Sequence, residues 1–246
     1  MDTQDQYHHP QSAISEITHE VISYINRLWG HLLNFDIDGI LSPLALTHYA
    51  DALHVHGAPT HTIIGFIDCM IVQTCCPSVS EKLVYTGYKK FHRMKFQAIM
   101  VLNGMIAHLD GPYHAPQNDA GVLLESGLLG CMCTHAIQPG LVEGNPPERQ
   151  YFWLYRDSVY AMSGVLVSPH TRVGVLTAVE WAWNMAMGGV HISAEHAFRI
   201  VLQEWPFLHC SWKSKASHPG HGMWPLVLCC CPPHQCAQHF CAQPDH

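Results

Sequence analysis

The stretch Thr62-Ile-Ile-Gly-Phe-Ile-Asp68 decides the fold, because it is an apolar run that closes on a carboxylate. Its β-branched and aromatic residues predict a strand buried in a sheet. A carboxylate at such a place is costly unless it is paired or bound to a metal. Three more acids stand at the edges of apolar segments, and these are Asp119, Asp157 and Glu195. Four such acids, in a chain with 19 Asp and Glu residues, predict one shared site for a hard divalent cation.

Glu195 and Asp68 are the two acids that the predicted elements bring together. A helix is expected over residues 189–205, and its apolar stripe holds Glu195 between Ile192 and Phe198. On that stripe the carboxylate faces the sheet, where Asp68 is its natural partner. Two carboxylates at close range repel each other unless a divalent cation lies between them. Mg²⁺ and Mn²⁺ prefer oxygen ligands, and a pair of them can activate water and stabilise a leaving oxygen. The acids therefore favour phosphoryl transfer on a nucleic acid.

Two of the four acids also have simpler interpretations. Asn118-Asp119 is typical of a helix N-terminus, where a carboxylate is common. Asp157 follows the apolar segment that begins at Tyr151 and can equally be a turn residue. The shared site is therefore predicted from the four acids as a set.

Composition limits the class of protein. The 246 residues are enough for one sizeable core with a small appendage, and 48% hydrophobic with 13% charged residues is typical of a globular chain. A net charge of −7 argues against strong nonspecific DNA binding, which depends on Lys and Arg. No apolar run approaches a membrane span and the first residues are polar, so we expect an intracellular chain with reduced cysteines.

The order of the predicted elements indicates an α/β fold, a mixed sheet flanked by helices. Helices are expected over 12–29, 43–56, 119–129 and 189–205, and strands over 62–67, 95–102, 105–109 and 151–155. Asn103-Gly104 is the turn of a hairpin between the second and third of these strands. We expect a short helical N-terminal segment (1–59), one α/β domain (60–212) and an irregular tail rich in Cys, His and Pro (213–246).

Several segments together carry a family resemblance. They are Gly65-Phe-Ile-Asp68, the segments 85–97 and 104–112, Asn118-Asp-Ala-Gly-Val-Leu124, Arg156-Asp-Ser-Val-Tyr160 and Ser193-Ala-Glu-His-Ala-Phe198. In this order they resemble the DDE endonuclease domain of Harbinger-type transposases. The resemblance implies an RNase H-like fold, metal-dependent cutting of DNA strands and a nuclear location. It also implies that Asp68, Asp119, Asp157 and Glu195 bind the Mg²⁺ or Mn²⁺ ions.

The chain departs from the family pattern beside the acids. Cys69 and Met70 replace the usual Gly-Thr, Arg156 replaces a glycine, and His191 stands where the family tends to have Arg. These departures motivate an alternative, a catalytically inactive transposon relic that serves as an interaction module or has no selected function.

One basic stretch is a candidate for DNA contact. Lys89, Lys90, Arg93 and Lys95 are interleaved with aromatic residues, which suits phosphate contacts beside the acids. The alternative is an edge strand whose lysines prevent aggregation. The segment before Thr62 is too short for a usual helix-turn-helix reader, so a separate DNA-binding protein is an expected partner.

The tail after Lys215 loses the family pattern, and we hypothesise that a frameshift replaced the native C-terminus. The competing interpretation is a zinc site from Cys229, Cys231, Cys236, His239 and Cys241. Their spacing fits no paired Cys-x-x-Cys arrangement, so zinc is the weaker interpretation.

Overall fold

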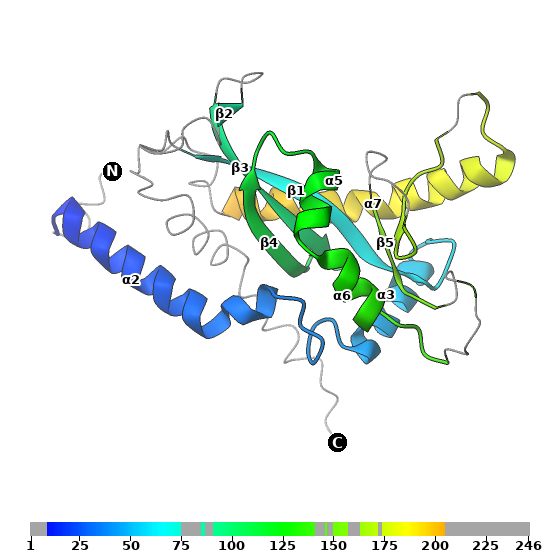
Figure 1. Cartoon of the computed structure of the whole chain (residues 1–246), viewed down its shortest axis with the longest axis horizontal. Helices are drawn as coiled ribbons and strands as arrows, with labels where there is room; N and C mark the ends of the chain where they lie inside the picture. Colours follow the sequence, from blue (N-terminus) through cyan, green and yellow to red (C-terminus); the bar gives the residue numbers. More distant parts are fainter. Residues whose placement is uncertain are drawn as a thin grey trace.

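The computed structural model describes residues 9–74, 85–86, 91–140, 146, 150–156, 163–171 and 174–204. Within these ranges, only the backbone is described at residues 11, 15, 73–74, 85–86, 91–92, 193–198, 200–202 and 204. The N-terminal part contains helix α2 (Gln11–Trp29), the short 3₁₀ helix η1 (Gly30–Leu33) and helix α3 (Pro43–Val55). Figure 1 shows α2 standing apart from the sheet, whereas α3 packs against the strand that follows it.

A six-stranded sheet forms the centre of the fold. Its strands are β1 (Ile63–Thr74), β2 (Tyr85–Thr86), β3 (Phe91–Met100), β4 (Ile106–His114), β5 (Trp153–Tyr155) and β6 (Leu166–Val167). The order is β2-β3-β1-β5-β6, and β4 also pairs with β3. Pairing is antiparallel among β1, β2, β3 and β4, and parallel from β1 to β5 and from β5 to β6. An antiparallel half continued by two parallel strands is the mixed sheet expected for an RNase H-like α/β fold.

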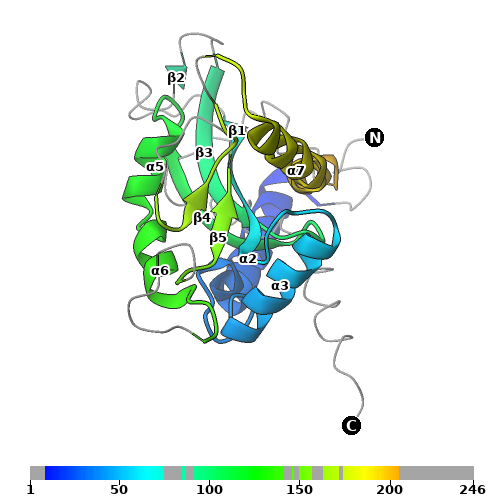
Figure 2. The ribbon, with the colours of Figure 1, turned by 90° about the vertical axis from the view of Figure 1, so that its right-hand side faces the viewer.

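Helices cover both faces of the sheet (Figure 2). Helices α5 (Asp119–Glu125) and α6 (Leu128–His135) lie on one face, and the long helix α7 (Ala178–Glu204) lies on the other. Side chains alternate between two core clusters because successive residues of a strand point to opposite faces. Phe66 and Met70 of β1 join Met187 on the α7 side, whereas Ile67 joins Leu123 on the α5 side.

The predicted helices over 12–29 and 43–56 and the hairpin about Asn103-Gly104 are confirmed. Gly104 has a φ of 79°, the left-handed conformation that such a turn requires. The predicted helix over 119–129 is wrong in detail, because it divides into α5 and α6 at Gly127, whose φ is 67°. Helix α7 begins earlier than the predicted residue 189, and β6 was not predicted. Among the described residues, no helix is long and apolar enough to cross a membrane.

Candidate active site

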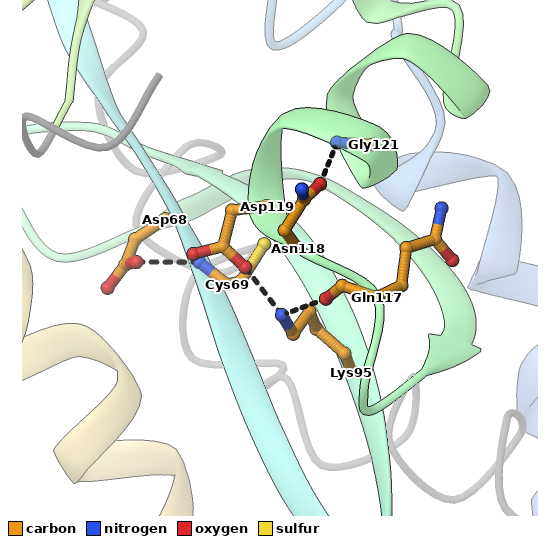
Figure 3. Close-up of polar contacts among 7 residues, drawn as sticks. All are labelled: Asp68, Cys69, Lys95, Gln117, Asn118, Asp119 and Gly121. Carbon is orange, nitrogen blue, oxygen red and sulfur yellow. Dashed lines mark hydrogen bonds and ion pairs between the residues drawn. The ribbon is translucent and has the colours of Figure 1, made fainter.

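Asp68 lies inside β1 rather than at its end. The predicted strand over 62–67 continues to Thr74, because residues up to Thr74 pair with β3, and Asp68 itself pairs with Ala98. On the other side of β1, the pairing with β5 stops at Phe66 and Tyr155. Asp68 is the second residue beyond that point, and its Oδ1 accepts a hydrogen bond of 2.7 Å from the backbone N–H of Cys69. Its half-buried side chain points toward α7 (Figure 3).

Asp119 begins helix α5, which confirms the interpretation of this residue as part of a helix N-terminus. The preceding residue, Asn118, is the N-cap, and its Oδ1 accepts a hydrogen bond of 2.7 Å from the N–H of Gly121. The Asp119 carboxylate is engaged by a lysine, since Lys95 Nζ lies 2.6 Å from Asp119 Oδ1 (Figure 3). Lys95 also donates to the carbonyl oxygen of Gln117 at 2.6 Å. The helix start and the lysine together hold this acid in place.

The Lys95–Asp119 pair lies on the α5 side of the sheet. Lys95 alternates along β3 with Met94 and Phe96, which belong to the core cluster on the α7 side. The lysine side chain is 8% exposed and that of Asp119 is 29% exposed. Asp68 faces α7, so the two carboxylates approach β1 from opposite sides. The structure therefore places Asp68 and Asp119 around the same segment of β1 without joining them on one face.

The chain leaves β5 beside Asp68. Tyr155 pairs with Phe66 in the parallel register, and the next residue, Arg156, is fully buried. The backbone N–H of Arg156 donates to the carbonyl oxygen of Val167 at 3.1 Å, which ties the end of β5 to β6. Asp157, the next predicted acid, lies outside the described residues.

Helix α7 crosses the same end of the sheet. The ring centroid of His191 lies 5.2 Å from that of Phe66 and 5.6 Å from that of Tyr155. Both α7 and β1 run from right to left in Figure 1. Glu195 follows His191 by about one helical turn, and at Glu195 the structure describes the backbone alone. Glu195 comes after His191 in α7, just as Asp68 comes after Phe66 in β1. Because the helix and the strand run in the same direction, the α7 backbone at Glu195 lies on the Asp68 side of the His191–Phe66 contact.

The face of α7 that packs on the sheet differs from the predicted stripe. Ile192 is 58% exposed, so the predicted place of this residue on the buried stripe is wrong. Met187 and Val190 are buried instead, with His191 beside them. The difference arises because Ile192 is five residues after Met187, which turns it well away from the buried side of a helix. His191 was noted only as a departure from the family, although its ring contacts both Phe66 of β1 and Tyr155 of β5.

The basic candidates separate into two groups. Lys89 and Lys90 lie outside the described residues, whereas Arg93 and Lys95 lie on β3. Arg93 is half-buried, and Lys95 is buried with its ammonium group on Asp119 and Gln117. In this state the charge of Lys95 is directed at the candidate acid rather than presented on the surface.

A second acidic region, which the sequence did not point out, lies on β4 and α5. Asp110, Tyr113, Glu125 and their neighbours line a hollow of about 380 Å³. The Tyr113 hydroxyl donates to Asp110 Oδ2, and burial, reinforced by this carboxylate, raises the pKa of Tyr113. Lys95 pairs with Tyr113 in the β3–β4 register.

The donor chemistry of the four acids fits a hard divalent cation, because Mg²⁺ and Mn²⁺ prefer carboxylate oxygens. Within the described ranges, no three His, Cys, Asp or Glu side chains gather closely enough to hold a metal ion. The described side chains of this set are those of Asp68 and Asp119; at Glu195 the backbone alone is described, and Asp157 lies outside the described residues.

Comparison with known proteins adds a family assignment. Residues 67–232 match the family model for the DDE superfamily endonucleases. The chain belongs to this family. All four candidate acids lie inside the matched region, which continues past residue 212, where we expected the domain to end. Membership indicates a transposase-type nuclease that acts on DNA, and such endonucleases generally use divalent metals. No curated protein and no solved structure matches the chain.

Proposed function

We propose that this chain is a Harbinger-type, divalent-metal-dependent DNA endonuclease and strand-transfer domain. In this proposal Asp68, Asp119, Asp157 and Glu195 hold one or two Mg²⁺ or Mn²⁺ ions. One observation carries the proposal: β5 and α7 both meet β1 just before Asp68, through the Phe66–Tyr155 register and the ring contacts of His191.

The backbone supports a convergence of three acids. Asp68 and Asp157 each follow, by two residues, the Phe66–Tyr155 pair, in which two parallel strands lie side by side. Two parallel strands run in the same direction, so residues at equal distances beyond a paired position lie at the same end of the two strands. Glu195 lies about one helical turn after His191, the α7 residue whose ring contacts Phe66 and Tyr155. We propose that these three acids share that end of the sheet, with Asp119 beside the same segment of β1 on its α5 side.

In the proposed site the metal ions would activate a water or hydroxyl nucleophile and stabilise the leaving oxygen. The protein contributes rigid placement. Asp68 is held by a strand that is paired on both sides up to Phe66, and Asp119 is held by Lys95 and by the start of α5. Lys89, Lys90 and Arg93 are the proposed contacts to the DNA backbone. A separate DNA-binding protein would supply sequence selectivity, and the place of action would be the nucleus.

Nicking of supercoiled plasmid in the presence of Mn²⁺ tests the proposal. We expect the wild type to nick, and Asp68→Asn or Glu195→Gln to lower the rate by roughly 100-fold or more, because each removes a metal ligand. Asp38→Asn is the matched control, since Asp38 is an exposed acid away from the sheet, and it should nick like the wild type. Equal rates in all four proteins would contradict the assignment.

Calorimetric titration with Mn²⁺ separates binding from catalysis. The wild type should bind Mn²⁺, and Asp68→Ala should bind it more weakly. Negligible and equal binding by the two proteins would remove the metal site from the proposal.

The buried guanidinium group of Arg156 favours a second candidate, an inactive relic that acts as an interaction module. A fully buried cation directly before Asp157 opposes the binding of another cation nearby. This candidate predicts that the wild type fails to nick DNA with Mn²⁺, whereas the endonuclease proposal predicts nicking that Glu195→Gln abolishes.

A further inference from the structure

Helix α2 carries an apolar stripe that the described part of the chain leaves uncovered. Ile17, Val21, Tyr24 and Leu28 are between 40% and 53% exposed. Neither core cluster contains a residue of α2 among the described side chains. Figure 1 shows the helix projecting beside the sheet rather than packing on it. Exposed apolar surface arranged in one stripe is typical of an interaction site.

The spacing of the stripe indicates what kind of surface would cover it. Its residues, starting from Ile14, follow one another by three, four, three and four positions: Ile14, Ile17, Val21, Tyr24 and Leu28. This is the a and d spacing of a heptad, which forms the narrow seam between two helices. Ile22 and Ile25, which flank the stripe, are half-buried, so the large apolar side chains left exposed from Ile17 to Leu28 are those of the narrow seam. The occupant that fits this exposed seam is therefore another helix.

The charges beside the stripe favour a second copy of α2. Glu20 and Arg27 are exposed and occupy the same heptad position one heptad apart, on one flank of the seam. In an antiparallel pair the two equivalent flanks face each other. When Val21 lies opposite Tyr24 of the partner subunit, Glu20 comes beside Arg27 of the partner subunit. The two-fold axis repeats this ion pair, because a symmetric contact uses the same patch on both copies.

The same register also matches side-chain size and orientation. Leu28 then lies opposite Ile17 of the partner subunit, and the small Val21 opposite the large Tyr24 of the partner subunit. A parallel pair would instead place Glu20 beside Ile25 of the partner subunit and leave the charges unmatched. We propose that α2 joins two copies of this chain as an antiparallel helix pair, through the stripe Ile17, Val21, Tyr24 and Leu28 and the Glu20–Arg27 pairs. This association does not depend on the nuclease activity.

Sedimentation velocity of the full chain, over a range of micromolar concentrations and with a reducing agent present, tests the proposal. The wild type should show a concentration-dependent equilibrium between monomer and dimer. Val21→Asp buries a charge in the seam and should leave the chain monomeric where the wild type is dimeric. Ser23→Asp is the matched control, because Ser23 is exposed on the same helix but lies off the stripe, and its dimer should persist.

Charge reversal tests the orientation without altering the apolar seam. Glu20→Arg and Arg27→Glu should each raise the Kd of the dimer roughly tenfold, because each turns two attractions into two repulsions. The double variant Glu20→Arg/Arg27→Glu should restore the wild-type Kd. A wild type that stays monomeric at all concentrations would overturn the proposal and assign the stripe to another occupant. A dimer that survives Val21→Asp, or a double variant without restoration, would overturn it as well.

Discussion

At the scale of single residues, the Lys95–Asp119 ion pair links β3 to the start of α5 beside β1. Its two partners are 24 residues apart, and the lysine is buried on one side of the sheet. We predict that Lys95→Met lowers the free energy of unfolding by about 1–2 kcal/mol, because it leaves a carboxylate without its cation. The cost stays modest since Asp119 is 29% exposed and water can solvate it. Urea denaturation measures the change.

A double-mutant cycle provides the control for that prediction. Lys95→Met/Asp119→Asn should cost less than the sum of the two single changes, because the pair is coupled. Additive costs would show that Lys95 stabilises the fold by packing of its aliphatic stem alone.

The side chain of His108 should make the free energy of unfolding depend on pH. It lies on β4 beside Phe35, with a ring-centroid distance of 6.0 Å, and burial lowers its pKa from the ordinary 6.5 against the opposing effect of Asp110. The unfolded chain therefore takes up this proton at a higher pH than the folded chain does. The contribution of His108 to the free energy of unfolding is fully present above pH 6.5. It is lost as the pH drops from 6.5 toward the lowered pKa, by at most about 1.4 kcal/mol per pH unit.

Chemical denaturation between pH 5 and 8 tests this linkage. His108→Gln should flatten the loss of stability below pH 6.5, whatever it does to stability at neutral pH. His48→Gln on α3 removes an exposed histidine and should keep the wild-type slope. Identical slopes for the wild type and His108→Gln would contradict the assignment.

At the scale of elements, the contact between β1 and β3 depends on a glycine. A Cβ atom at Gly65 would lie 2.5 Å from the carbonyl oxygen of Met100, so any side chain forces the strands apart. We predict that Gly65→Ala lowers the free energy of unfolding by roughly 1–3 kcal/mol. Gly130→Ala in α6 meets nothing within 4 Å and should instead stabilise the chain by roughly 0.5–1 kcal/mol. Thermal and urea unfolding of both variants would show opposite signs, and equal effects would contradict the steric argument.

The sequence predicted the elements whose causes are local. Helices α2 and α3 follow from apolar periodicity and a proline start, and the β3–β4 hairpin follows from the Asn103-Gly104 turn. The predicted end of β1 was wrong because the strand was ended at the carboxylate of Asp68, although the apolar run resumes at Cys69-Met-Ile-Val72 and pairs with the distant β3. Helix α7 begins before its predicted start, and this was missed because its first turns are largely exposed and show no clear stripe.

For the candidate site, too, the sequence predicted the features with local causes and missed those that depend on packing. The acids stand out because they interrupt apolar elements, which is a local signal. The sequence gives no sign that Lys95 is the partner of Asp119, because Lys95 belongs to a basic stretch that is typical of an exposed surface. Its burial results from the packing of α5 over β3, which no sequence spacing shows.

At the scale of the whole molecule, the described core lies in the middle of the chain. Both core clusters are built from residues between Leu33 and Val190, and α2 contributes to neither. The folded domain and the α2 helix are therefore separable in stability: changes on the α2 stripe should alter association while leaving the melting temperature of the domain nearly unchanged.

The same distribution of the core leads to a prediction about the C-terminal part, which lies outside the described residues. If the tail replaced the native C-terminus, as we hypothesise, ending the chain at Lys215 should lower the melting temperature by less than about 3 °C, or roughly 1 kcal/mol. The family match reaches residue 232, so a chain ending at Cys231 is the informative comparison. Thermal melts of the full chain and both shortened chains, under reducing conditions, decide the matter. Should the chain ending at Lys215 melt far below the one ending at Cys231, residues 216–231 would be part of the fold and the tail hypothesis would fail.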